Sequence, residues 1–178
     1  DHLLHIPNFY EFKHNKDVVD NNIVGFAARM ETRKCPHFLQ GIKSELTTDP
    51  KDVLWWKRNL DIDTTDWKIY KFNYEFLGKF YNRDWGISHS AHIFEPFGYG
   101  IFQAIDYGKL PILAQDWLTE YDYPFRAQSP EEFKEQYETI CKLSTKERQE
   151  YLVPLRDYLR KFDNKKQWTE QLLKLYNE

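Results

Sequence analysis

At 178 residues the chain has the length of one domain, and its many aromatic residues can fill a sizeable core. A net charge of −3 gives the whole chain no general attraction to nucleic acid or to anionic membranes, although it leaves room for a local basic site. Two distant cysteines, no long apolar run and no signal peptide predict a cytoplasmic protein without a metal motif or a transmembrane segment. Because the sequence starts at Asp1 rather than Met, we expect a fragment of a longer chain.

The first predicted element is a buried strand. Residues 23–28 form a continuous apolar run, which is typical of a parallel strand covered on both faces. A charged turn follows from Arg29 to Lys34. Pro36 suits the first position of a helix, and apolar residues at helical spacing extend that predicted helix to Leu46.

The middle of the chain alternates strand and helix signals. Residues 46–66 are polar around a short aromatic cluster, and their pattern does not distinguish helix from strand. Residues 67–72 alternate apolar and basic side chains, as a half-buried strand does. A helix over residues 74–84 and a strand over residues 86–90 are predicted to follow.

A turn, a helix and a strand come next in close order. Pro96 and Gly98 mark the turn, and the apolar residues within 101–105 recur on one face of a helix. Gly108 suits the C-terminal cap of that helix, and residues 110–114 form a short apolar strand.

The last part of the chain is predicted to be helical. Residues 123–126, which contain a proline, suit a strand at the edge of a sheet. Ser129, Ser144 and Asn164 are each placed to cap an amphipathic helix, and these helices occupy about residues 130–178.

Alternating strands and helices predict a single α/β domain over residues 1–178, with a Rossmann-like, mostly parallel sheet and helices on both faces. In such sheets ligands bind outside the carboxyl ends of the strands, and Arg29, Lys34 and Glu95 all follow predicted strands. Glu95 also precedes the start of a helix, where backbone N–H groups bind anions. These features together predict a ligand that carries both phosphate and hydroxyl groups.

The stretch after the third predicted strand contains residues at the spacing of a known motif, namely Glu95, Phe97-Gly98, Gln103-Ala104, Gly108 and Pro111. The set resembles the signature of the C-terminal, nucleotide-sugar-binding domain of retaining glycosyltransferases with the GT-B fold, of the group 1 type. Gln103 stands where that signature has a second acid. Arg29 and Lys34 match the Arg-x4-Lys pair of the same family, with Cys35 in place of the glycine that usually follows.

The resemblance implies an enzyme of the hexosyltransferase type that moves a sugar from a nucleotide-diphosphate sugar with retention, without a metal or another cofactor. Arg29 and Lys34 then bind the diphosphate and stabilise its departure, and Glu95 binds hydroxyls of the sugar. The other implied nucleotide-sugar-binding positions are Phe97, the backbone of Gly98 and Tyr99 at the distal phosphate, and Gln103 at the ribose. The base is left open between uridine, as in a UDP-sugar, and guanosine.

The resemblance also implies a partner domain. The N-terminal acceptor domain of a GT-B enzyme is absent from this chain, and we therefore expect the isolated chain to bind a donor without transferring its sugar. The acceptor, whether a glycan, a lipid or modified DNA, is left open. One alternative is a non-catalytic nucleotide-sugar-binding or assembly module, for which Gln103 would be the mark. The other alternative is a viral DNA-modifying glycosyltransferase with a basic acceptor face in the missing half.

Five further residues have a functional and a structural interpretation. Tyr70 or Phe72 would stack on a nucleobase if the resemblance extends to the base pocket, although packing in the core is the favoured interpretation. His89 is interpreted as a structural group, and His92 as either structural or a sugar contact. Cys35 is interpreted as a passive thiol rather than one of low pKa.

Overall fold

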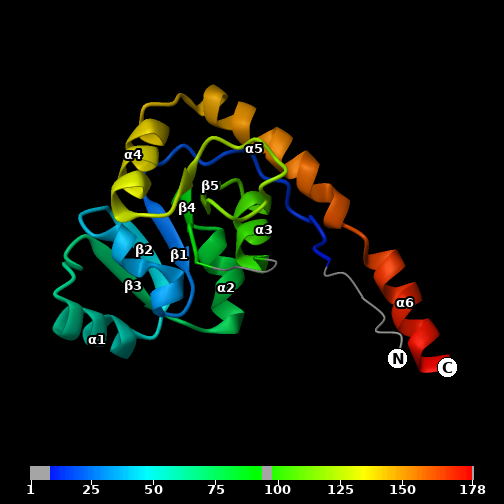
Figure 1. Ribbon diagram of the computed structural model, residues 1–178, viewed down its shortest axis with the longest axis horizontal. Helices are drawn as coiled ribbons and strands as arrows, with labels where there is room; N and C mark the ends of the chain where they lie inside the picture. Colours follow the sequence, from blue (N-terminus) through cyan, green and yellow to red (C-terminus); the bar gives the residue numbers. More distant parts are fainter. Residues whose placement is uncertain (1–8, 94–97, 178) are drawn as a thin grey trace.

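The computed structural model describes residues 9–93 and 98–177. A sheet of strands in the order β3-β2-β1-β4-β5-β6 lies at its centre, and each neighbouring pair is parallel (Figure 1). The predicted α/β, Rossmann-like fold is therefore confirmed.

The strands are short and most are buried, as expected of parallel strands covered on both faces. They are β1 (Val24–Ala27), β2 (Ser44–Thr48), β3 (Trp67–Lys71), β4 (Ile87–Ser90), β5 (Leu110–Ala114) and β6 (Arg126–Ala127). Every residue of β2, β4 and β5 is buried, whereas β3 lies at the edge of the sheet and is only partly covered.

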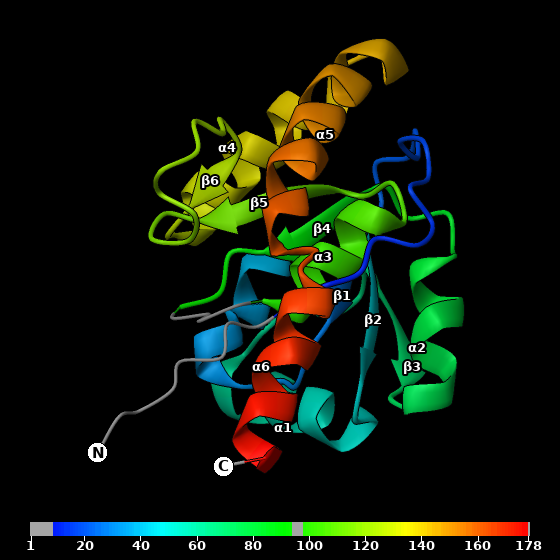
Figure 2. The same ribbon diagram turned by 90° about the vertical axis from the view of Figure 1, so that its right-hand side faces the viewer.

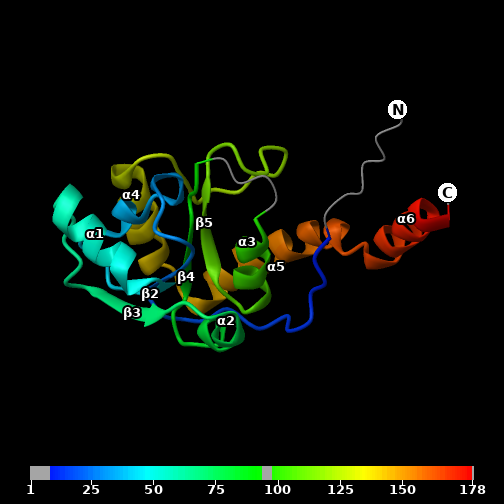
Figure 3. The same ribbon diagram turned by 90° about the horizontal axis from the view of Figure 1, so that it is seen from below.

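Helices cover both faces of the sheet. They are α1 (Pro50–Leu60), α2 (Tyr74–Tyr81), α3 (Tyr99–Asp106), α4 (Pro130–Cys141), α5 (Thr145–Leu159) and α6 (Lys165–Asn177), with 3-10 turns η1 (Thr32–Lys34), η2 (Pro36–Leu39) and η3 (Arg160–Phe162). Figure 3 shows α1 and α4 on one side of the sheet and α2 on the other. α4 contacts η2, and α3 contacts β4, β5 and α5. Within the described ranges, no helix is both long and apolar enough to cross a membrane.

Residues 9–20, which we call the N-terminal arm, are bound to α3. The buried carboxylate of Asp106 accepts hydrogen bonds from the hydroxyl of Tyr10 and from successive backbone N–H groups of the arm. At the start of the arm, the ring centroids of Phe9 and Trp168 in α6 lie 5.1 Å apart. From this contact α6 extends away from the sheet in Figure 1, and it therefore lies in front of the sheet in the view of Figure 2.

Two of the three predicted helix caps are confirmed, whereas Oδ1 of Asn164, ahead of α6, has no hydrogen-bond partner among the described residues. Ser129 and Ser144 cap α4 and α5, each accepting a hydrogen bond from the backbone N–H three residues on. Gly108 follows α3 with a φ of 78°, and a Cβ there would lie 2.0 Å from the carbonyl oxygen of Asp17. Glycine ends this helix because the arm passes too close for any side chain.

The helix predicted over residues 36–46 is wrong. Only its first turn, η2, is helical, and Gly41 with a φ of 71° then leads the chain into β2. Leu46 belongs to β2, where it pairs with Phe26 on one side and Ile69 on the other. Pairing with strands on both sides outweighs the local helical spacing of the apolar residues.

The stretch from 46 to 66, which the sequence pattern left undecided, contains α1. The side chain of Asp49 caps the helix by accepting a hydrogen bond from the backbone N–H of Lys51, and Pro50 occupies the first turn. The apolar side of α1 buries Val53 and Trp56.

Gly25 lies in β1 against the ring of Trp85. A Cβ at Gly25 would come within 2.2 Å of atoms of that ring. The ring is held in place because the indole N–H donates to the carbonyl of Phe80 at 2.9 Å and the side chain is buried. We expect Gly25→Ala to lower the free energy of unfolding by about 1–3 kcal/mol, measured by chemical denaturation.

Gly78→Ala is the matched control for this packing argument. Gly78 lies in α2, where an added Cβ meets only the hydroxyl of Tyr107, at 3.8 Å. Alanine favours a helix over glycine by about 0.5–1 kcal/mol, and the control should therefore keep or raise stability. Equal losses in both variants would contradict the packing argument.

Candidate functional site

The topology creates a crevice between β1 and β4. The two strands are neighbours, with Val24 paired to Ile87, but the chain leaves β1 toward β2 and leaves β4 toward β5 on the opposite side. Right-handed crossovers then run to opposite faces of the sheet, through η1 and η2 in one case and α3 in the other. The space outside the carboxyl ends of β1 and β4 is where open α/β sheets bind ligands.

Two hydrogen bonds join the chain segments that leave β1 and β4. The carbonyl oxygen of Arg33 accepts a hydrogen bond from the backbone N–H of Ile93 at 2.8 Å. The carbonyl oxygen of Cys35 lies 2.8 Å from Nε2 of His89. The charged loop after β1 is therefore fixed against the exit of β4. The predicted convergence of this loop with Glu95 lies outside the described residues.

The interpretation of His89 as a structural group is supported. Its Nδ1 accepts a hydrogen bond from the backbone N–H of Ala91 at 3.3 Å, and Nε2 therefore carries the proton that it donates to Cys35. Burial, with a smaller contribution from the neighbouring His92, lowers the pKa of His89 to about 3. A buried imidazole with both nitrogens engaged holds the loop and does not act as a base.

His89 makes stability depend on pH in a defined direction. The unfolded chain binds a proton on this residue near pH 6.5, whereas the folded chain does so only near its pKa of about 3. Stability is therefore complete above about pH 6.5 and falls, by roughly 1 kcal/mol per pH unit, as the pH drops toward 3. We expect His89→Gln to remove this loss, measured as free energies of unfolding at about pH 7 and about pH 5. Equal losses in both proteins would contradict the assignment.

Cys35 and His92 lie beside this contact. Burial raises the pKa of the Cys35 thiol, which is 1% exposed, and the thiol is therefore passive rather than reactive. His92 lines a cavity of about 240 Å³ at the ends of β4, β5 and β6, together with Asp116 and Gln128. Contact between His92 and a sugar stays a prediction.

The loop after β1 gathers its cations around one carboxylate. Nε of Arg29 lies 3.3 Å from Oε1 of Glu31, and Nε of Arg33 lies 2.7 Å from Oε2. The hydrogen bond from Arg33, together with the charges of Arg29, Arg33 and Lys34, lowers the pKa of Glu31. Arg29 and Lys34 therefore lie close together at the predicted edge. Glu31 and Arg33 were not predicted, because alternating charges in a loop are the only signal that they give in the sequence.

The glycosyltransferase-like motif is described only in its second part. Glu95 and Phe97 lie outside the described residues. Gly98 has a φ of 76° and starts α3, with Tyr99 as the first helical residue and half exposed. Gln103, one turn further on, is partly buried and lines a pocket of about 490 Å³ between α2, α3 and the N-terminal arm. The contacts of these residues with a nucleotide sugar stay predictions.

Tyr70 packs as the structural interpretation expects. Its ring lies under the guanidinium of Arg83 at 4.5 Å and beside Phe76, with ring centroids 5.7 Å apart. Phe72 is 38% exposed beyond the end of β3, and its ring meets that of Tyr74 at 5.0 Å. Of the two, Phe72 therefore retains an exposed surface for a base.

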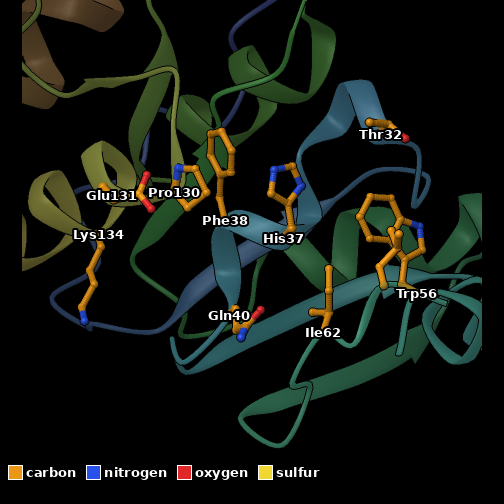
Figure 4. A pocket seen from close by; sticks show the side chains of 10 residues that line it. Thr32, His37, Phe38, Gln40, Trp56, Ile62, Pro130, Glu131 and Lys134 are labelled. Carbon is orange, nitrogen blue, oxygen red and sulfur yellow. The ribbon is translucent and has the colours of Figure 1, made fainter. Parts of the chain in front are cut away.

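A third pocket, of about 730 Å³, lies beside the loop after β1, between η2, α1 and α4 (Figure 4). Figure 4 shows His37 between Phe38 and Trp56, with Lys134 of α4 on the far side. The rings of His37 and Trp56 are parallel within 8°, with centroids 6.1 Å apart. The indole N–H of Trp56 donates to the carbonyl of Met30 at 2.8 Å and thereby ties α1 to the loop. Trp56 thus fixes the backbone of the loop at Met30.

The described residues form no cluster of metal-ligating side chains. Among residues 9–93 and 98–177, no group of three or more His, Cys, Asp or Glu side chains is arranged to hold a metal ion.

Comparison with known proteins gives structural matches only. No family model matches the sequence, and no curated protein matches it. A point mutant of TarM from S. aureus, in complex with fondaparinux, α-GlcNAc-glycerol and UDP, has a TM-score of 0.72 at 14% identity, covering 98% of this chain and 39% of that one. Sucrose-phosphate synthase from Thermosynechococcus elongatus has a TM-score of 0.68 at 16% identity, covering 97% of this chain and 51% of that one.

The pneumococcal O-GlcNAc transferase GtfA, in complex with UDP and GlcNAc, has a TM-score of 0.60 at 15% identity, covering 98% of this chain and 38% of that one. These neighbours are glycosyltransferases of the GT-B fold, and the chain has the fold of one of their Rossmann-like domains. The chain spans about two fifths to one half of the length of the solved structures that it matches.

Proposed function

We propose that the chain is the donor-binding domain of a retaining glycosyltransferase of the hexosyl type, which takes a sugar from a nucleotide-diphosphate sugar. The proposal includes an N-terminal acceptor domain outside these residues, because the matched structures are about twice as long or longer. It also includes a cytoplasmic location, since both cysteines, Cys35 and Cys141, are free thiols.

The observation that carries the proposal is the hydrogen bond between the loop that follows β1 and the segment that follows β4, at the crevice between these strands. The loop that holds Arg29 and Lys34 is bonded to Ile93, from which the chain continues into the Glu95 motif. Cations and a carboxylate on adjacent loops suit a ligand with a diphosphate at one end and hydroxyls at the other. The TarM mutant and GtfA, which share this fold, were both solved with UDP bound.

In this proposal the protein cations act on the departing group. Arg29 and Lys34 neutralise the diphosphate as the anomeric carbon of the sugar exchanges its bond to the distal phosphate oxygen for a bond to an acceptor oxygen, which loses its proton. Glu95 accepts hydrogen bonds from hydroxyls of the sugar, next to Phe97. The backbone N–H groups of Gly98 and Tyr99 lie at the start of α3, where a helix favours an anion, and meet the distal phosphate.

The enzyme and the non-catalytic alternative interpret Gln103 differently, as a ribose ligand or as a lost acid. As a ribose ligand, its amide can donate one hydrogen bond and accept another, where a carboxylate would accept from both hydroxyls. Its place on the wall of the pocket beside α3 leaves the side chain accessible for this role. A non-catalytic binding module would keep the nucleotide site and lack transfer even when joined to its acceptor domain.

Thermal unfolding with a panel of nucleotide sugars tests the proposal. The panel contains UDP, GDP and their sugars. The ligands with one of the two bases, uridine or guanosine, should raise the melting temperature of the chain, and the corresponding nucleoside should raise it much less. The isolated chain should transfer no sugar, because the acceptor groups lie in the other domain. No shift with any nucleoside diphosphate would refute the donor site, and efficient transfer by the isolated chain would refute the missing domain.

A further inference from the structure

The acidic side chain of the cationic loop occupies a central position. The carboxylate of Glu31 pairs with Nε of Arg29 at 3.3 Å and with Nε of Arg33 at 2.7 Å. The Glu31 side chain is 34% exposed, compared with 79% for Arg29 and 53% for Arg33. Glu31 is therefore the most covered of the three side chains, and both guanidinium groups pair with it.

Backbone hydrogen bonds hold Glu31 in this position. Its N–H donates to the carbonyl of Arg29 at 2.8 Å, and its carbonyl accepts from the N–H of Lys34 at 2.9 Å. Arg33 is fixed in turn, because its carbonyl accepts from the N–H of Ile93 at the exit of β4. The loop thus presents Arg29, Arg33 and Lys34 near the carboxylate of Glu31 at the edge of the crevice.

We propose that Glu31 occupies the place of the donor diphosphate in the ligand-free chain, and that Arg33 becomes a third diphosphate ligand when the donor displaces this carboxylate. The inference rests on the proposed function. A diphosphate carries more charge than a carboxylate and offers more acceptor oxygens, and the planar forks of arginine bind phosphate oxygens in pairs. The internal carboxylate then makes the site selective, since a weaker anion has to compete with Glu31 for the same donors.

Titration of the chain with UDP and GDP by calorimetry tests this inference. Exposed ion pairs of this kind are weak, and Glu31→Gln should therefore bind the preferred nucleoside diphosphate about three- to tenfold more tightly than wild type. Arg33→Ala should bind it about tenfold or more weakly. The affinity for the nucleoside should not change in either variant.

Glu150→Gln is the matched control, because Glu150 is an exposed carboxylate in α5 that pairs with Lys146 at 3.9 Å. It removes the same charge and should leave UDP and GDP affinity unchanged. Binding that is equal in wild type and Glu31→Gln, or stronger in Arg33→Ala, would overturn this inference and leave the donor site intact. If neither wild type nor Glu31→Gln binds UDP or GDP, both the proposed function and the inference are overturned.

Discussion

Replacing Asp106 by alanine is expected to lower the free energy of unfolding by about 3–5 kcal/mol, measured by chemical denaturation. Asp106 is fully buried at the end of α3. Its carboxylate accepts from the hydroxyl of Tyr10 at 3.3 Å and from the backbone N–H groups of Lys13, His14 and Asn15 at 3.1, 3.0 and 2.7 Å. Hydrogen bonds to a charged acceptor are stronger than neutral ones, and the variant would leave several donors without a partner.

The matched control is Asp157→Ala in α5. Asp157 is 63% exposed and pairs with Arg160 at 3.3 Å, and its loss should change stability by less than about 0.5 kcal/mol. A loss below about 1 kcal/mol in Asp106→Ala would mean that the N-terminal arm is not bound through this carboxylate. The arm matters for the site because it is attached to α3, the helix that carries Tyr99 and Gln103.

Lys34→Ala is expected to weaken binding of UDP or GDP by about 10- to 100-fold, while binding of the free nucleoside stays the same. The reason is that a charge-assisted contact with phosphate contributes about 1.5–3 kcal/mol, and the nucleoside has no phosphate to lose. Calorimetry with the nucleoside diphosphate and the nucleoside measures both affinities in wild type and variant.

Lys146→Ala provides the charge-matched control for this experiment. Lys146 is 87% exposed near the start of α5, where its neighbour Thr145 contacts Asp20 ahead of β1, at the amino end of the sheet. Its removal changes the net charge equally and should leave both affinities unchanged. Equal losses for nucleoside and diphosphate in Lys34→Ala would remove Lys34 from the phosphate site.

The central strands could be predicted because their local pattern and their tertiary role agree. Residues 23–28 and 110–114 are continuous apolar runs, and β1 and β5 are buried between helices as such runs indicate. The helix predicted over residues 36–46 failed because Ile42 and Leu46 lie four apart by coincidence. The strand conformation of Leu46 depends instead on its pairing with β1 and β3, which are distant in the sequence.

The candidate site could be predicted in part for the same reason. Arg29 and Lys34 follow a strand signal and therefore lie at the carboxyl edge. The role of Glu31 between the arginines depends on side-chain geometry, and the contact between Arg33 and Ile93 depends on the adjacency of β1 and β4. Neither contact can be predicted from the spacing of residues in the sequence.

Mapping where UDP or GDP changes the amide NMR spectrum of the isolated chain tests the central claim most directly. The account predicts changes at residues 28–35, 91–93 and 98–103, around the carboxyl ends of β1 and β4. Residues 83–86 and 108–110, at the amino ends of β4 and β5, should remain unchanged. Changes confined to the amino ends, or a spectrum that neither nucleotide alters, would contradict the assignment of a nucleotide-sugar site to this crevice.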